Sequence, residues 1–458
     1  MDWLTLLPPS VAIVIAVWKK DVIISLLSAL FVAEFLLVEF NPAIAFLTTF
    51  DRIVGVFQST SNTQVLMFSL MIGALLALIR KSGGVAAFVQ WVTQIGFASS
   101  QRKVGVVPTL LGVLIFIETN LSILTAGFVS RDLFDKVKMS RARLAYIIDS
   151  TCAPICVIIL FNAWGATILG LISAYELESP VETLAMSVPY NLYSWLTLFL
   201  VFYTVWSGRV FGPMKQSEEK QIKVQANKQD AHEPTSMSLM VVPMLTMIGS
   251  IIFFMWYTGN GEILKGSGST SVLWAVASAC LVAFVMIRLS KKVQARQKQT
   301  AVSMIKWGFE GMSELLPLVT TVLLALALGS AMKALGTGQF VAQMVTENLP
   351  LFTVPALIFI AGAIMSFTTG TSWGTFSILI PIGVPISIAS GIPTEIVLAG
   401  ILGGSIFGDH CSPISDTTIV SSLAAGCDHL EHVKTQLPYA LTAGGLSVIG
   451  FLLVGLSY

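Results

Sequence analysis

Four short polar stretches interrupt otherwise apolar parts of this sequence, and each contains side chains that can hold a small cation. Carboxylates stand there beside serines, threonines, glycines and prolines. Carboxylate and hydroxyl oxygens are hard ligands, and carbonyls freed at a helix break add further oxygens. We therefore expect sodium to bind near Asp149, Asp409 and Asp416. The candidate ligands of this ion or of a substrate are Glu118, Asn120, Ser122, Asp149, Ser150, Thr151, Asn162, Thr369, Thr371, Ser372, Thr375, Asp409, His410, Ser412, Asp416 and Thr417.

Helix-breaking residues accompany these candidates. Proline lacks the N–H that a helix needs, and glycine reaches backbone conformations that other residues avoid. Half-helix ends inside a membrane present backbone groups to ions and substrates. The predicted helix-breaking positions are Pro154, Gly370, Gly408 and Pro413.

Each candidate also has a structural interpretation. Glu118 could cap a span at the membrane surface, and Asp149 could cap a half-helix that starts at Pro154. The runs of Ser, Thr and Gly could serve tight helix packing. His410 could handle a proton or could be a hydrogen-bonded structural histidine. Since ionisable residues inside a membrane are costly, we take the functional interpretation as the working hypothesis.

The composition indicates a membrane protein. Hydrophobic residues make up 55% of the 458 residues and charged residues 11%, with a mean hydropathy of +0.82. A soluble domain carries about 25% charged residues, so this chain cannot cover a water-facing surface. A net charge of +1 gives no basic excess for nucleic acid. Five cysteines exclude a secreted disulfide scaffold, and the lipid bilayer is the predicted partner.

Motifs of nucleotide-binding proteins and serine hydrolases are missing from the sequence. It contains no P-loop, no Rossmann glycine fingerprint and no Gly-x-Ser-x-Gly motif. We therefore expect no cofactor and no enzymatic activity. Cys427, His429 and His432 have a spacing that could hold zinc, but no fourth ligand is near. We predict that these residues lie in a polar cytoplasmic loop between helices.

Apolar runs long enough to cross about 30 Å of hydrocarbon recur along the chain. Some of them are short enough to be hairpins or half-helices. The predicted fold class is an all-α polytopic membrane protein with about 11–13 transmembrane segments, including broken or re-entrant helices. The runs lie near 3–18, 22–39, 63–79, 104–118, 144–173, 184–208, 238–257, 271–289, 315–333, 351–369, 372–390, 394–425 and 437–457.

The charged loops predict an orientation. Lys and Arg gather in 131–143, 215–228 and 288–298, whereas 175–182 contains three acids and no base. The positive-inside rule then places the basic loops in the cytoplasm and the N-terminus outside. The first apolar run precedes its lysine pair, so we expect it to be retained as a span.

Polar blocks recur in the same order in the two halves of the chain. The matched pairs are 81–90 with 333–342, 118–125 with 368–375, and 149–155 with 408–414, the last placing Cys152 on Cys411. The first copy contains the basic loop 131–143, whereas its counterpart 381–395 contains no Lys or Arg. One loop is predicted to be cytoplasmic and the other external. The copies are therefore predicted to be inverted-topology repeats, a feature of secondary transporters.

This pattern predicts five parts of the chain. A polar linker near the middle separates the two repeats. The parts are N-terminal spans at 1–59, a first transport repeat at 60–211, a cytoplasmic linker at 212–236, central spans for scaffold or dimer contact at 237–300, and the inverted second transport repeat at 301–458.

The densest polar block resembles the signature of a known transporter family. Residues 408–418 (Gly-Asp-His-Cys-Ser-Pro-Ile-Ser-Asp-Thr-Thr), with 425–429 and 435–439, resemble the NhaC family of sodium/proton antiporters. Residues 144–155, and 373–375 with the following Pro381, are similar to other segments of that family. The likeness extends in order over roughly residues 60–458.

The resemblance implies a prokaryotic inner-membrane exchanger with inverted repeats, re-entrant hairpins and a homodimeric assembly. It implies Na⁺ and H⁺ as the transported ions. Some members of the family couple these ions to malate, lactate or amino acids. The stretch 116–121 (Phe-Ile-Glu-Thr-Asn-Leu) differs from the pattern of many relatives in the block expected to face the substrate.

We therefore predict a sodium/proton antiporter that works by alternating access, with the ion site between broken helices of the two repeats. A buried carboxylate that binds either a proton or sodium gives exchange without holding both. The alternative is a sodium- or proton-coupled transporter of a small organic acid or amino acid. In that case Asn120, Ser122, Thr371 and Ser372 would contact the organic group. A channel has less support, because no filter motif is present.

Overall fold

The computed structural model describes residues 2–19, 21–94, 100–116, 119–175, 177–220, 234–263, 266–296, 301–337, 340, 343 and 349–457, and this described part contains helices and no strand. The helices are η1 (Asp2–Leu6), α1 (Leu7–Lys19), α2 (Val22–Leu37), α3 (Pro42–Gly55), η2 (Val56–Gln58), α4 (Thr60–Lys81), α5 (Gly84–Gln94), α6 (Gln101–Leu114), α7 (Thr119–Lys136), α8 (Arg141–Ile158), α9 (Ala163–Ile172), α10 (Pro180–Tyr190), α11 (Leu192–Ser207), α12 (Pro213–Lys220), α13 (Ser238–Thr258), α14 (Gly268–Leu289), α15 (Lys291–Arg296), α16 (Ala301–Leu335), η4 (Leu351–Thr353), α18 (Val354–Thr369), α19 (Ser372–Ser390), α20 (Thr394–Cys411), α21 (Asp416–Ala425) and α22 (His429–Gly455).

Seven described helical segments are long and apolar enough to cross a membrane, and three bent pairs raise the number to ten. The pairs are α2 with α3, α8 with α9, and α10 with α11, bent by 120°, 46° and 44°. The all-helical, polytopic class with broken helices is confirmed. The count is lower than predicted because several predicted spans form shorter or more polar helices. For example, α20 carries Glu395, Asp409 and His410 in 18 residues.

The chain forms two compact units. Unit 1 comprises Met1–Ser59, Ser100–Val224 and Thr321–Tyr458, and unit 2 comprises Thr60–Ser99 and Gln225–Thr320. Helix α16 runs from unit 2 into unit 1. The five-part division drawn from the sequence stays a prediction.

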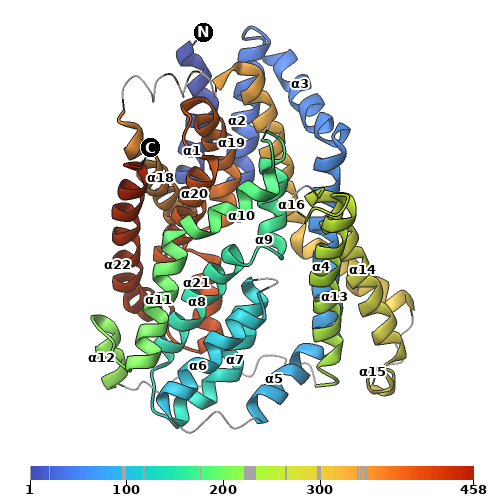
Figure 1. Ribbon diagram of the computed structural model, residues 1–458, viewed down its shortest axis with the longest axis vertical. Coiled ribbons are helices and arrows are strands. Elements are labelled where there is room, and N and C mark those ends of the chain that lie inside the picture. Colours follow the sequence, from blue (N-terminus) through green and yellow to red (C-terminus); the bar gives the residue numbers. More distant parts are fainter. Residues whose placement is uncertain are drawn as a thin grey trace. The chain divides into compact units, whose positions relative to one another are not determined.

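In unit 2, α14 packs against both α13 and α4 (Figure 1). Helices α4 and α16 touch through their backbones, because a Cβ on Gly73 would lie 2.3 Å from the Gly311 oxygen. Arg80 and Glu314 form an ion pair at 2.5 Å nearby, and Lys81 pairs with Glu310. Helix α16 is therefore joined to α4 by a close glycine contact and by two surface ion pairs.

In unit 1, α18 and α20 run parallel with their backbones in contact (Figure 1). A Cβ on Gly404 would lie 2.2 Å from the Phe359 oxygen, and a Cβ on Gly408 would lie 2.2 Å from the Ala363 oxygen. The two contacts are four residues apart on both helices, which fixes the parallel direction. Only glycine allows so close an approach.

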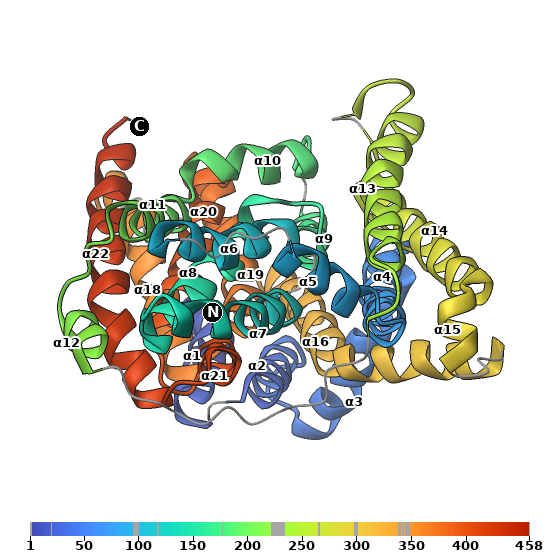
Figure 2. The same ribbon diagram turned by 90° about the horizontal axis from the view of Figure 1, so that it is seen from below.

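Helices α6 and α7 form a hairpin in unit 1 (Figure 2). Gln101, at the start of α6, donates a hydrogen bond to the Val137 oxygen just beyond α7, at 3.1 Å. The C-terminal end of α6 packs on α8, since a Cβ on Gly112 would lie 3.0 Å from Thr151 and 3.3 Å from Cys152. The open end of this hairpin therefore lies beside the start of α8.

Two arginines connect this same end of unit 1 to the C-terminus of α21. Arg131 donates from Nε to the Ala424 oxygen at 2.5 Å and from Nη2 to the Leu423 oxygen. Arg141 donates from Nη1 to the Gly426 oxygen at 3.3 Å. Cations favour the negative end of a helix dipole, so these contacts stabilise the end of α21.

Two predicted helix-breaking positions are wrong. Pro154 lies inside α8, which continues to Ile158. The missing N–H of the proline removes only one hydrogen bond, and the packing of the buried residues on both sides of it keeps the helix intact. Gly408 also lies within a helix, α20, where its missing side chain permits the contact with α18. By contrast, Gly370 follows the last residue of α18 with φ 71°, and Pro413 lies between α20 and α21.

The predicted loop before the last span is also wrong. Helix α22 begins at His429, where Asp428 caps it by accepting a hydrogen bond from Glu431 N at 2.9 Å. The apolar run that predicts the last span starts only at residue 437. The first turns of α22 are polar but packed into unit 1, so hydropathy alone could not reveal them.

Candidate functional site

Asp409, near the C-terminal end of α20, accepts hydrogen bonds from two hydroxyl groups, one at each of two helix breaks. Its Oδ2 accepts a hydrogen bond from Ser372 Oγ at 2.8 Å, and its Oδ1 accepts one from Ser415 Oγ at 2.5 Å. All three side chains are buried. Ser372 is the first residue of α19, and Ser415 is the N-cap of α21. We call these three residues the Asp409 site.

The two breaks that form this site touch each other. Ser412 Oγ donates to the Phe367 oxygen at 2.8 Å. A Cβ on Gly370 would lie 2.6 Å from the Ile414 oxygen, and its φ of 71° is in the left-handed region that favours glycine. The loop between α18 and α19 is thereby fixed against the loop between α20 and α21.

Asp149, in the middle of α8, points to a different set of partners. Its Oδ2 accepts hydrogen bonds from Gln436 Nε2 at 2.7 Å and from His432 Nε2 at 3.3 Å, both on α22. Gln436 Nε2 also donates to the His410 main-chain oxygen at 2.9 Å. We call Asp149, His410, His432 and Gln436 the Asp149 cluster. Each of its side chains is at most 1% exposed.

The Asp149 cluster holds several polar atoms whose hydrogen-bonding capacity is unused. Among the described residues, no partner reaches Asp149 Oδ1, His410 Nε2, His432 Nδ1 or Gln436 Oε1. His410 Nδ1 lies 3.1 Å from the hydroxyl of Tyr193 on α11. Native proteins pair the large majority of buried polar atoms, so four orphans on four adjoining side chains are unusual.

Asp416, at the start of α21, differs from Asp149 and Asp409 in its exposure. Its side chain is exposed, and its Oδ1 accepts a hydrogen bond from Thr417 N at 2.9 Å. The hydroxyl of Thr417 is 3.0 Å from that of Ser415. An acid in the first turn of a helix is favoured by the dipole. Asp416 is thus accessible, whereas Asp409 is enclosed.

Candidates in the first half fix the α6–α7 hairpin to α8 and α9. Ser122 Oγ donates to Cys152 Sγ at 3.1 Å. Asn162 caps α9 through Gly165 N and donates from Nδ2 to the Cys156 and Ile159 oxygens at 2.7 Å each. Its amide therefore satisfies carbonyls freed at the break between these helices.

The remaining hydroxyl candidates bond to their own helices. Thr151, Thr369 and Thr375 each donate to the carbonyl four residues earlier, at 2.5–2.8 Å. Thr371 caps α19 by accepting from Gly374 N at 3.3 Å, and Ser150 is buried on α8. Glu118 and the side chain of Asn120 lie outside the described residues. Their roles stay predictions.

Sequence reasoning missed four residues that the structure brings to these sites: Tyr193, Ser415, His432 and Gln436. His432 and Gln436 are four residues apart, so they lie on one face of a helix. That spacing indicates a helix, but the polar residues around it favoured the prediction of a loop. Tyr193 carried no sequence signal, because it reaches His410 only through tertiary packing.

The cysteine and histidines weighed as a zinc site do not come together. His429 bonds to the Pro413 oxygen at 2.6 Å and lies 3.1 Å from Ser422 Oγ, whereas His432 faces Asp149. Burial raises the pKa of the Cys427 thiol to about 12, which disfavours the thiolate that zinc needs. Within the described part, no group of three or more His, Cys, Asp or Glu side chains could hold a metal ion.

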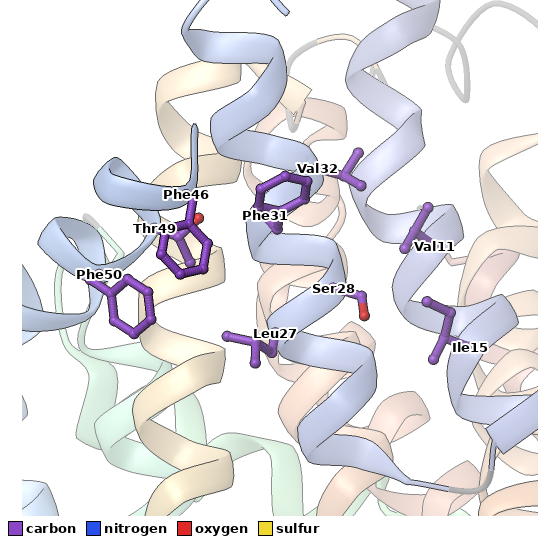
Figure 3. Close-up of a pocket in the computed structure, with 9 residues that line it drawn as sticks. All are labelled: Val11, Ile15, Leu27, Ser28, Phe31, Val32, Phe46, Thr49 and Phe50. Atoms are coloured by element: carbon purple, nitrogen blue, oxygen red, sulfur yellow. The ribbon is translucent and has the colours of Figure 1, made fainter. Parts of the chain in front are cut away.

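A pocket of about 380 Å³ lies between α1, α2 and α3 in unit 1 (Figure 3). Seven of its lining residues are apolar, and the other two are Ser28 and Thr49. Thr49 already donates its hydroxyl to the Ala45 oxygen at 2.7 Å. The lining contains no charged side chain and no candidate ligand, so we do not assign the ion site to this pocket.

Comparison with solved structures shows a transporter fold. The chain is similar to the YdaH transporter of Alcanivorax borkumensis, with a TM-score of 0.56 and 14% sequence identity over 90% of each chain. At this identity the likeness concerns the fold alone.

Sequence relatives extend over the whole chain or over local segments. An uncharacterized protein of Haemophilus influenzae is 29% identical over 99% of this chain and 91% of its own length. The malate-2H⁺/Na⁺-lactate antiporter of Bacillus subtilis is 33% identical over 30% of each chain. The Na⁺/H⁺ antiporter NhaC of the same organism is 30% identical over 25% of this chain and 28% of its own.

The family signature agrees with these relatives and with the resemblance found in the sequence. The description Na⁺/H⁺ antiporter family matches residues 144–456, a region that contains Asp149, Asp409 and the helices around them. The predicted resemblance to NhaC proteins is confirmed. This chain is a multi-pass membrane protein and a secondary transporter rather than an enzyme, and it belongs to the Na⁺/H⁺ antiporter family.

Proposed function

We propose that this protein exchanges sodium for protons by alternating access, with the Asp409 site as its ion site. The observation that carries the proposal is the convergence of Ser372 and Ser415, from two helix breaks, on one buried carboxylate. A lone carboxylate is costly inside a membrane unless it is partnered or binds an ion. Here two hydroxyls supply oxygen atoms beside it.

The ligand chemistry fits a small hard cation. The carboxylate and both hydroxyls can turn lone pairs toward an ion, since a hydroxyl oxygen is both donor and acceptor. All are oxygen ligands, which alkali and alkaline-earth cations prefer. A proton on Asp409 would remove the negative charge that attracts sodium. The two cargoes would therefore compete for one group, which is the requirement for exchange.

The helix directions support alternating access through inverted repeats. In the first half, the α6–α7 hairpin opens at the end of unit 1 that carries Arg131 and Arg141. In the second half, α20 leads toward that end, because the following helix α21 terminates there. Since α18 runs parallel to α20, the α18–α19 hairpin opens toward the opposite end. Two hairpins of opposite direction are the arrangement of inverted-repeat transporters.

The charges support a cellular orientation for the same proposal. With the arginine-bearing end in the cytoplasm, the protein lies in a prokaryotic inner membrane with its N-terminus outside. We also propose that the protein forms a homodimer. Cysteine accessibility at residues 1–10 and cross-linking in membranes would test these two points separately.

Purified protein in liposomes tests the exchange. An inward sodium gradient should alkalinise the lumen of vesicles that contain a pH-sensitive dye, as protons leave in exchange. Choline chloride at the same ionic strength is the control, and a protonophore should abolish the signal. A pH change that does not depend on sodium would count against the proposal.

A second candidate function is exchange of a small organic ion coupled to sodium or protons. The named relative that carries malate and lactate favours it, as does the Asp149 cluster, which is buried and only partly hydrogen-bonded. Uptake of labelled organic acids and amino acids into the same vesicles would distinguish it from cation exchange alone.

A further inference from the structure

We propose that the pocket between α1, α2 and α3 holds one acyl chain of a membrane phospholipid, with the phosphate of that lipid beside Lys19. This inference concerns a lipid site and not the transported ions, so it goes beyond the proposed function and does not depend on it. It rests on the lining of the pocket, its size, its opening toward the bilayer, and its distance from the membrane interface.

The lining of the pocket favours hydrocarbon over a polar ligand. Helix α2 lies between the other two helices (Figure 3). Its Leu27 and Phe31 point toward α3, and its Ser28 and Val32 point toward α1. None of the described lining residues is charged, and the Thr49 hydroxyl is already bonded within its own helix. A polar ligand would therefore lose its hydration there and gain few partners.

The size of the pocket suits a hydrocarbon chain. An apolar cavity of about 150 Å³ takes one benzene molecule. At about 380 Å³ this pocket has room for more than twice as much hydrocarbon. Water is a poor occupant, because a buried water needs about two to four polar partners. A helix of a second copy is about 10 Å wide, whereas a flexible acyl chain can follow a narrow space between three helices.

The pocket opens on a surface that faces the bilayer. Phe46 and Phe50 line the pocket and are 57% and 52% exposed. Val54 is four residues further along α3, so it continues the same stripe, and it is 64% exposed. In a multi-pass membrane protein, a continuous apolar face of this kind contacts lipid. An acyl chain can therefore enter the pocket directly from the bilayer.

The depth of the pocket matches the acyl chains of one leaflet. Trp18 is 71% exposed at the end of α1, and Lys19 Nζ lies 3.9 Å from the centre of its ring. Tryptophan and lysine at a helix end are typical of the membrane interface. Ile15 and Val11 precede Lys19 on α1, roughly 6 and 12 Å deeper at about 1.5 Å per residue. One leaflet contributes about 15 Å of hydrocarbon, so both residues lie at acyl-chain depth.

The charges near the pocket favour an anionic headgroup at Lys19. Arg52 on α3 is neutralised, because its Nε donates to Glu34 Oε1 on α2 at 2.7 Å. Asp21 caps α2 by accepting a hydrogen bond from Ile24 N at 2.9 Å. Lys19 is exposed at the end of α1. A lipid phosphate at this position would form charge-assisted hydrogen bonds with the ammonium group, while the chain lies in the pocket.

Photolabelling of the full-length protein tests the site. The probe is a phosphatidylglycerol with a diazirine in one acyl chain, added in increasing fractions to nanodiscs of unlabelled phospholipid. After irradiation, mass spectrometry identifies the labelled residues. Labelling of the lining residues of α1, α2 and α3 should saturate as the fraction of probe rises. Labelling of Leu47, which is 63% exposed on α3 and does not line the pocket, should rise in proportion to that fraction.

Variants then locate the chain. Leu27→Trp places a larger ring in the pocket, and saturable labelling should fall roughly tenfold, the equivalent of about two buried methylene groups. Leu47→Trp is the matched control, because it makes the same change outside the pocket and should leave this labelling unchanged. Ser28→Leu fills the pocket with a smaller side chain and keeps the test decisive if Leu27→Trp does not fold. Lys19→Gln should weaken labelling by the probe about two- to fivefold.

Several outcomes would overturn the proposal. One is labelling of the lining residues that rises in proportion to the probe, as at Leu47, and another is unchanged labelling in both Leu27→Trp and Ser28→Leu. Stronger competition by free oleate than by unlabelled phospholipid would assign the pocket to a fatty acid. Conversion of a dimer to a monomer by Leu27→Trp would assign it to a second copy. Saturable labelling that is lost in Leu27→Trp and kept in Leu47→Trp supports the lipid site, whether or not the protein exchanges sodium.

Discussion

The two buried carboxylates of unit 1 differ in what surrounds them. Asp409 stands three residues before a helix break and accepts hydroxyls from Ser372 and Ser415. Asp149 lies in the middle of α8 and accepts hydrogen bonds from an amide and an imidazole on α22. Both Asp409 oxygens are paired, whereas one oxygen of Asp149 is not. Asp409 thus lies among hydroxyl oxygens, whereas Asp149 lies beside nitrogen donors from one helix.

In the predicted alignment of the two halves, the two acids stand one position apart. The alignment that pairs Cys152 with Cys411 places Ser150, not Asp149, at the position of Asp409. Successive residues of an α-helix point about 100° apart. The two acids therefore point to different neighbours, Asp409 to Ser372 at the start of α19 and Asp149 to His432 and Gln436 on α22. Matched segments need not carry matched functions.

The largest effect is expected from Asp409→Asn. The change keeps the shape but removes the charge that attracts sodium, and sodium-driven proton release from liposomes should fall on the order of 100-fold. Glu314→Gln, an acid paired with Arg80 in unit 2, should keep wild-type exchange. Equal exchange rates in Asp409→Asn and wild type would refute the ion site.

Gly408→Ala should have the next largest effect. Its Cβ would lie 2.2 Å from the Ala363 oxygen, so α20 must move from α18, and overpacking of this kind costs about 1–3 kcal/mol. The measurement is the apparent melting temperature, together with sodium affinity. Gly445→Ala is the control, because nothing lies within 4 Å of its added Cβ. If Gly408→Ala behaves like Gly445→Ala, the contact that positions Asp409 is not required.

Ser372→Ala and Ser415→Ala should each lower sodium affinity roughly tenfold, since each removes one hydroxyl from Asp409. Ser415 also caps α21, so its loss should lower stability by about 1 kcal/mol as well. Sodium titration and thermal unfolding of both variants would separate the two roles. Unchanged affinity in both variants would show that the hydroxyls are structural only.

Thr418→Val should have the smallest effect. Its hydroxyl reaches the Asp409 main-chain oxygen at 3.5 Å, the outer limit of a hydrogen bond. Sodium affinity should change less than about threefold. A loss as large as that of Ser372→Ala would extend the ion site along α21 and weaken the contrast with the Asp149 cluster.

Much of the Asp409 site could be predicted from sequence. Asp409, Ser372 and Gly370 stood in polar interruptions of apolar runs, which is a local property. Ser415 stood in the same block but was not singled out. Its selection depends on the turn after α20, which brings it back to Asp409. The local sequence pattern indicated the region of the site, whereas the turn after α20 determines which side chain contacts Asp409.

The sequence by itself determined that this chain spans a membrane, that its candidate ligands are concentrated in a few polar stretches within apolar runs, and to which family it belongs. These follow from composition and from short motifs, which do not depend on distant contacts. Only the tertiary structure decided that Asp149 meets His432 and Gln436 and that Asp409 meets Ser372. The Asp149 partners are separated from it by more than 280 residues, and the energy of burying each group depends on which helices pack against it.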